Sequence, residues 1–170
     1  VFAWRPEHPQ PLVLAANRDE FYDRTCLPLA EWPEVPGLYA GRDLLAGGTW
    51  LGVTAGGRFA ALTNIRDPRL KAGPRSRGAL TTEYLLGQAS APAYLDRIMR
   101  DAADYAGFNL LLGDRQQLWH FNSREGRPRQ LRSGIYGMSN ASLDTPWPKL
   151  LYAREALRER IEGVDEDLLE

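Results

Sequence analysis

Hydrophobic and polar positions in the first third of the chain alternate in short runs that are typical of strands. Four apolar runs predict the strands of two hairpins, at residues 1–4, 12–16, 50–54 and 59–63. A proline-rich turn joins the first pair, and glycines at 56 and 57 join the second. The intervening stretch contains Pro28, Pro33 and Pro36 and is predicted to be a loop.

The period then changes to the three-and-four spacing of amphipathic helices. Leu80, Tyr84 and Leu85 predict one helix, and the apolar positions from Tyr94 to Ala102 predict a second that opens near Ser90. Strand character returns in three segments, at residues 108–112, 118–122 and 134–140. Strands before and after a helical block predict an α+β fold in which helices cover antiparallel sheets.

A last helix is predicted to begin with Thr145 as its N-cap and Pro146 as its first helical residue. Its spacing predicts one buried apolar face, formed by Trp147, Leu150, Leu151, Leu157 and Ile161.

Composition favours one globular domain over residues 1–170. The chain is 44% hydrophobic and 25% charged, with a formal net charge of −1. This balance gives no general attraction for nucleic acid, and no apolar run is long enough to span a bilayer. With Cys26 as its single cysteine the chain forms no internal disulfide, which fits a cytoplasmic location. Neither end resembles a natural terminus, so we expect both to be cut.

The clearest chemical signal is the polar run Asn17, Arg18, Asp19 and Glu20, which follows two alanines at the end of a predicted strand. Small residues leave room above a sheet, and alternation would place Asn17 and Asp19 on one face and Arg18 with Glu20 on the other. The run would then supply a cation and carboxylates to a polar site. A turn with surface ion pairs is the simpler alternative.

Five sequence blocks resemble the NRDE family, whose animal members are the transport and Golgi organisation proteins. They are NRDEF at 17–21, GGTWLG at 47–52, ALTN at 61–64, FNLLLGD at 108–114 and GMSNASLDTPWPK at 137–149. The blocks stand in family order across nearly the whole chain. This resemblance implies an αββα sandwich of antiparallel sheets like that of N-terminal-nucleophile hydrolases. It also implies that the first few residues, including a cysteine, and the C-terminal strands are absent here.

The more remote choloylglycine hydrolase and penicillin V acylase group implies roles for individual residues. Arg18 and Asp19 would match that group's arginine and aspartate, with Glu20 as an alternative carboxylate, and Asn64 and Asn140 would match its two asparagines. A cysteine thiolate would attack an amide carbonyl, the α-amino group would move the proton, and asparagine amides would stabilise the oxyanion. Without the resemblance, both asparagines are better explained as turn residues.

The segment 66–77 holds five cations against one acid and is predicted to be an exposed loop. Its position after Asn64 would place Arg66, Arg75 and Arg77 at the mouth of the same site, where they suit a carboxylate or phosphate. Asn17 and Glu20 complete the candidate ligand-binding set. A solvated loop without a specific partner is an equal alternative.

Other chemistry finds less support in the sequence. Cys26 lies in the proline-flanked segment and is interpreted as packing, not as a nucleophile. His8 and His120 have no second ligand at metal spacing, so neither a metal site nor a cofactor is predicted. Gly47 and Gly48 lack the lysine of a phosphate loop and are interpreted as a tight bend on the pocket floor.

Three functional hypotheses follow. The first is a carrier for a small hydrophobic anion such as haem or an acyl lipid, which the family resemblance implies. The alternative is a cysteine amidohydrolase that acts on a non-peptide C–N amide bond, so enzymatic activity stays open. The third, a purely structural module, explains the polar run at 17–20 least well.

Overall fold

The structure is a computed structural model that describes residues 1–65 and 73–167, with side chains as far as Ile161. The small sheet is antiparallel, in the order β10-β1-β2, and the large sheet is antiparallel, in the order β3-β4-β5-β6-β7-β8-β9. The strands are β1 (Phe2–Trp4), β2 (Leu12–Leu14), β3 (Cys26–Trp32), β4 (Val35–Asp43), β5 (Leu51–Thr54), β6 (Phe59–Asn64), β7 (Phe108–Gly113), β8 (Leu118–Asn122), β9 (Arg127–Gln130) and β10 (Gly134–Tyr136). The α-helices are α1 (Gly78–Leu86), α2 (Ala91–Asp101) and α3 (Pro148–Asp167), and a 3-10 turn, η1, spans Ala102–Asp104.

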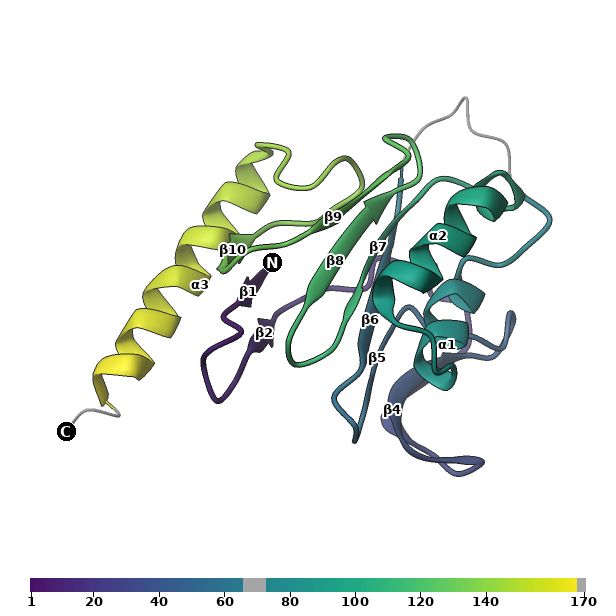
Figure 1. The fold of residues 1–170 in the computed structure, drawn as a ribbon, viewed down its shortest axis with the longest axis horizontal. Coiled ribbons are helices and arrows are strands. Elements are labelled where there is room, and N and C mark those ends of the chain that lie inside the picture. Colours follow the sequence, from purple (N-terminus) through teal and green to yellow (C-terminus); the bar gives the residue numbers. More distant parts are fainter. Residues whose placement is uncertain (66–72, 168–170) are drawn as a thin grey trace.

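The elements stack in four layers. Figure 1 shows α3 on one side, then the small sheet, then the large sheet, with α1 and α2 on the opposite side. This arrangement confirms the predicted α+β class with antiparallel sheets. The specific likeness to N-terminal-nucleophile hydrolases stays a prediction. Within the described residues no helix has both the length and the apolar composition needed to cross a membrane.

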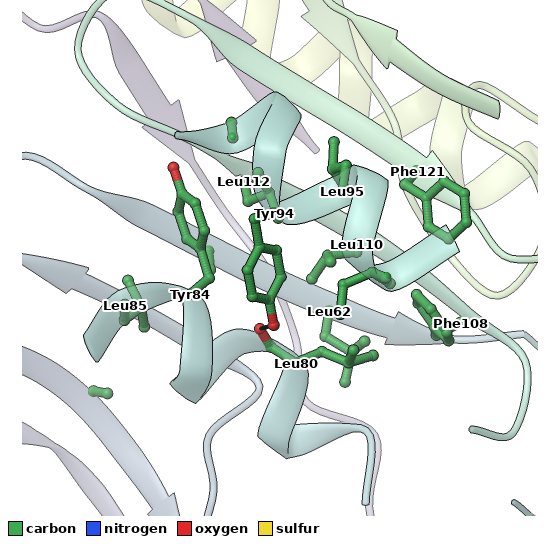
Figure 2. Close-up of a cluster of buried hydrophobic side chains, with 14 of the residues drawn as sticks. Leu62, Leu80, Tyr84, Leu85, Tyr94, Leu95, Phe108, Leu110, Leu112 and Phe121 are labelled. Atoms are coloured by element: carbon green, nitrogen blue, oxygen red, sulfur yellow. Dashed lines mark hydrogen bonds between the residues drawn. The ribbon is translucent and has the colours of Figure 1, made fainter. Parts of the chain in front are cut away.

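Alternation along β7 explains how one strand serves two cores. Leu110 and Leu112 point towards α1 and α2, whereas Leu111 points towards the small sheet. The helix-side core is shown in Figure 2 and gathers buried side chains from α1, α2 and five strands of the large sheet, β3, β4, β6, β7 and β8. In it, the buried Tyr94 hydroxyl donates to the Leu80 carbonyl at 2.7 Å, so the phenol is satisfied away from water.

The proline-containing segment after residue 25 is not a loop, and that prediction was wrong. It forms the β3–β4 hairpin, with β3 at the edge of the large sheet. An edge strand tolerates proline because one of its sides makes no ladder hydrogen bonds. A register shift between Leu27 and Ala30 accommodates Pro28. Strand β9 was also missed, because its arginines carry no apolar signal.

The start of the last helix was also misplaced. The helix begins at Pro148, and Thr145 lies in the preceding turn, where its hydroxyl donates to the Ser142 carbonyl at 2.8 Å. Proline is favourable at the first helical position, and the helix does begin with a proline. That residue is Pro148 and not the predicted Pro146. Leu150 is buried as predicted, but Leu151 is 51% exposed.

Candidate functional site

A cleft of about 1010 Å³ lies where the two sheets, α1 and α3 meet. Its lining comes from the segment after β2, the ends of β4 and β6, the start of α1, the loop after β10 and the first turns of α3. Val1, which precedes β1, also lines it. Segments far apart in the sequence therefore build one site.

The cleft brings together most of the side chains that the sequence singled out. The predicted residues that line it are Asn17, Arg18, Asp19, Glu20, Asn64, Arg75, Arg77 and Asn140. Arg66 lies outside the described residues. Shared location is a geometric finding, and the catalytic and binding roles of these residues stay predictions.

The polar run at 17–20 does not continue the strand. β2 ends at Leu14, and residues 15–20 are irregular and exposed, so the expected alternation of faces does not occur. Ala15 and Ala16 line the cleft, which agrees with the idea that small residues leave space there.

Arg18 faces a thiol. Its guanidinium donates to Cys26 Sγ at 3.6 Å, and both side chains are exposed in the cleft. The interpretation of Cys26 as a partly buried packing residue was therefore wrong. Cys26 starts the edge strand β3 instead of a loop, and this position turns its side chain towards the cleft.

An ion-pair cluster shapes the side of the cleft next to this thiol. Arg24 donates through Nε to Asp43 at 2.8 Å and lies 3.8 Å from Glu20. Asp43 also accepts from the backbone N–H groups of Leu45 and Ala46. Although partial burial raises the pKa of Asp43, the hydrogen bonds from Arg24 and these N–H groups hold it below its usual value. Glu20 thus has a structural partner that the sequence did not reveal.

Arg77 is the cation best placed to attract an anion. It is half-buried, its Nη1 donates to the Gly107 carbonyl at 3.2 Å, and no carboxylate among the described residues lies within ion-pair distance of it. Burial lowers the pKa of the Arg77 guanidinium, an effect that nearby Glu20 opposes and Arg24 reinforces. Arg75, by contrast, pairs with Glu83 at 2.9 Å.

The start of α1 adds positive potential beside Arg77. The helix has no side-chain cap and no acidic residue in its first turn, so the N-terminal end of its dipole is not neutralised locally. The backbone at Gly48 packs closely against the start of α1. Only glycine allows this contact, since a Cβ at position 48 would lie 2.7 Å from the Gly78 carbonyl carbon. Gly47 has a positive φ of 77°, which matches the predicted tight bend, but of the two glycines only Gly48 lines the cleft.

Asn140 and Asn64 meet directly. Asn140 Nδ2 donates to the backbone carbonyl of Asn64 at 2.8 Å, which ties the loop after β10 to the end of β6. The Asn64 side chain itself is exposed in the cleft. One of the two amide N–H groups of Asn140 is therefore committed to structure.

A polar row beneath this loop, in which Asn109 and Asn122 are buried and Thr63 is partly buried, was missed in the sequence. Register pairs Thr63 with Asn109 and Asn109 with Asn122, so the three lie side by side across β6, β7 and β8. Asn109 Nδ2 donates to the Ala141 carbonyl at 2.7 Å, and its Oδ1 accepts from Asn122 at 2.9 Å and lies 3.2 Å from His120 Nε2.

The polar row thus holds the loop that carries Asn140 over the cleft. The available signal was the polar residues within three mostly apolar strands, because a fully buried asparagine needs hydrogen-bond partners. No group of three or more metal-ligating side chains is found in the described part of the chain.

The fold and the cleft define a class: an α+β sandwich that presents a polar, arginine-rich cleft where two antiparallel sheets, α1 and α3 meet. Comparison of the sequence with protein families then gives a family model, Transport and Golgi organisation 2, that matches residues 1–169. The chain belongs to this family, as its sequence blocks predicted.

Relatives in mammals and insects support the assignment. The chain is 38% identical over 160 residues to Transport and Golgi organization protein 2 homolog of Bos taurus and to that of Homo sapiens. It is 29% identical over 178 residues to Transport and Golgi organization protein 2 of Drosophila melanogaster. The alignments cover 89% of this chain but 58% of each mammalian protein, and 91% of this chain but 62% of the fly protein.

Proposed function

We propose that the cleft binds a small amphiphilic anion, such as haem or an acyl anion, and that the protein acts as a carrier for it. The observation that supports this most is the excess of positive charge in the cleft of a chain whose formal net charge is −1. Six basic side chains line it: Arg18, Arg24, Arg42, Arg75, Arg77 and Lys149. Three carboxylates oppose them: Asp19, Glu20 and Asp43.

The ion pairs of the basic side chains indicate which end of the cleft can bind an anion. Arg24, Arg42 and Arg75 each have a carboxylate partner, in Asp43, Glu34 and Glu83. Arg77 donates to a carbonyl and stands at the uncapped start of α1. A half-buried guanidinium next to a helix N-terminus is a favourable place for a carboxylate, because charge-assisted hydrogen bonds strengthen as water is excluded.

The rest of the cleft suits the apolar body of such a ligand. Leu62, Met138 and Leu150 contribute to its walls, and Ala15 and Ala16 keep it open. A mixture of apolar walls with a few convergent polar groups is typical of sites for small organic molecules. A hydrophobic anion fits this pattern better than a fully hydrated one does.

The test is a titration with haem, followed by its absorbance, and with a fluorescent fatty acid. Removing the charge in Arg77→Gln should weaken binding about tenfold to a hundredfold, since a hydrogen bond between charged groups contributes roughly 1.5–3 kcal/mol. The control is Arg158→Gln, which removes an exposed arginine whose partner is Glu155 on α3. Equal affinities of the two variants, or no binding by the unmodified chain, would reject the proposal.

A second candidate, cysteine-dependent hydrolysis of a non-peptide amide, is favoured by one observation. Arg18, Asp19, Asn64 and Asn140 line the same cleft as Val1, which precedes β1, and the family resemblance implies a cysteine shortly before Val1. The commitment of Asn140 to the Asn64 carbonyl weakens its case as an oxyanion donor. Turnover of acylated amines by the protein with that cysteine, lost on its change to alanine, would place this candidate first.

A further inference from the structure

The end of β6 divides the cleft into two lobes. Strand alternation turns Leu62 towards α1 and α2 and turns Thr63 towards the small sheet, where its hydroxyl donates to the Ser139 carbonyl. Asn64 pairs with the helix-side residue Phe108, so its side chain lies on the same side as that of Leu62. Leu62, Thr63 and Asn64 all line the cleft, which therefore extends over both faces of this strand end.

We call the part on the helix side the α1 lobe and the part on the small-sheet side the α3 lobe. Figure 1 shows α1 and α3 on opposite sides of the two sheets. The α1 lobe is lined by Leu62, Asn64, Arg77 and Gly78, and the α3 lobe by Thr63, Met138, Lys149 and Leu150. Lys149 Nζ lies 5.4 Å from the centre of the Trp147 ring, a contact that leaves its N–H donors open to a ligand.

Each lobe holds one cation without a carboxylate partner. Arg77 in the α1 lobe donates to the Gly107 carbonyl, and Lys149 stands in the α3 lobe. The acid nearest to Lys149 in sequence is Asp144, which binds Arg154 at 3.1 Å. Over residues 1–65 and 73–161, neither Arg77 nor Lys149 lies within ion-pair distance of a carboxylate. Each lobe can therefore hold one anionic group.

The other unpaired charges in the cleft do not add a further anion site. Arg18 and Asp19 are adjacent in the chain, so their opposite charges offset each other. Glu20 opposes part of the charge of Arg77, but it also lies 3.8 Å from Arg24. Arg77 and Lys149 are thus the two places where an anionic group of a ligand gains most.

Apolar walls accompany both cations. Leu62 contributes to the α1 lobe, and Met138 and Leu150 contribute to the α3 lobe. A ligand that fills both lobes meets a cation in each of them and apolar surface beside each cation.

We propose that the cleft takes an amphiphilic dicarboxylate, with one carboxylate at Arg77 and the other at Lys149. This rests on the proposed function and narrows its ligand class from amphiphilic anions in general to those with an acidic group at both ends. Because the two cations lie on different elements of a packed fold, their separation also selects the length of the ligand.

The test is isothermal titration calorimetry with hexadecanedioate and hexadecanoate, which differ only in the second carboxylate. The unmodified chain should bind the dicarboxylate about fivefold more tightly, since an exposed ion pair contributes up to about 1 kcal/mol. Lys149→Gln should remove this preference by weakening the dicarboxylate alone, because the monocarboxylate places its only charge at Arg77.

Two control variants keep the cations of the cleft. Lys149→Arg retains the charge and should retain the preference. Arg158→Gln removes a cation of α3 that does not line the cleft, so it should also leave the preference unchanged. A series from decanedioate through tetradecanedioate to octadecanedioate should show an optimum length, whereas apolar burial alone would raise affinity steadily with each added methylene.

Equal affinities of the two acids for the unmodified chain would overturn the dicarboxylate proposal. An equal loss of both acids in Lys149→Gln would do the same, because Lys149 would then act on any anion. Binding of hexadecanoate that depends on Arg77, without a preference for the dicarboxylate, would leave the carrier function standing alone. If neither acid nor haem bound, the proposed function would be rejected together with this inference.

Discussion

Changing the buried His120 to glutamine should remove a large part of the acid sensitivity of the fold. His120 is 2% exposed and its Nε2 lies 3.2 Å from Asn109 Oδ1. Asn109 Nδ2 donates to carbonyl and hydroxyl oxygens on its other side, so Oδ1 must face the ring. The ring is therefore neutral with its proton on Nε2 in the folded protein, and protonation of Nδ1 would place a charge in the interior.

The magnitude follows from the shift of this one group. Burial lowers the pKa of His120 from 6.5 to about 4, an effect that Glu125 opposes and Arg129 reinforces, each to a smaller extent. Above pH 6.5 the ring is neutral in both folded and unfolded chains, and its contribution to stability is fully present. As the pH falls below 6.5, His120 becomes protonated in the unfolded chain but stays neutral in the folded chain. The free energy of unfolding therefore decreases until about pH 4. At about 1.4 kcal/mol per pH unit, the loss over that interval is roughly 3 kcal/mol.

The assay is urea denaturation at several pH values between 7.5 and 4.5. The difference in unfolding free energy between the unmodified chain and His120→Gln isolates this histidine, because carboxylates titrate equally in both proteins. His8→Gln, which changes a partly exposed histidine in the turn between β1 and β2, is the control and should keep the full pH dependence. A pH slope for His120→Gln identical to that of the unmodified chain would refute the reasoning, as would an NMR titration of the His120 ring centred near pH 6.5.

Two further predictions concern the supports of the cleft. Asn109→Asp replaces an N–H donor with an oxygen 2.7 Å from the Ala141 carbonyl, so it should cost about 3 kcal/mol or more of unfolding free energy by urea denaturation; unchanged stability would remove the polar row from its supporting role. Gly48→Ala forces a Cβ against the Gly78 backbone and should lower the melting temperature and, if the proposed function holds, the affinity for haem. Gly56→Ala should leave both unchanged, because its Cβ would lie 3.7 Å from its nearest neighbour, Thr54 Oγ1.

Periodicity was a good guide wherever one face of an element is buried. The α2 helix begins after Ser90, whose side chain accepts from the Ala93 N–H, and β8 spans the residues expected. The β3–β4 hairpin was not predicted because its edge strand is exposed along most of its length. The segment therefore showed no apolar alternation, and its prolines led to the prediction of a loop. Local rules describe buried faces and lose their basis at exposed edges.

The candidate site was only partly predictable for a related reason. The polar run at 17–20 and the asparagines at 64 and 140 could be named because their sequence blocks resemble a family. The contact between Arg18 and Cys26, and the support of the 139–141 loop by Asn109, depend on strand register and on the packing of one sheet against another. Those distances arise only from the assembled fold.

The pairing of β1 with β10 has a consequence for the order of assembly. The large sheet is a meander of neighbouring strands, interrupted once by the helical block, whereas Ala3 finds its partner Ile135 across 132 residues of chain. Closing so long a loop costs conformational entropy before its contacts repay it, so we expect the large sheet with α1 and α2 to form first. Pulse-labelled amide exchange during refolding, with β7 protected ahead of β1, would show this order. The cleft is lined by residues next to both sheets, so it would form only after β1 has paired with β10, which we expect to be the slowest step of folding.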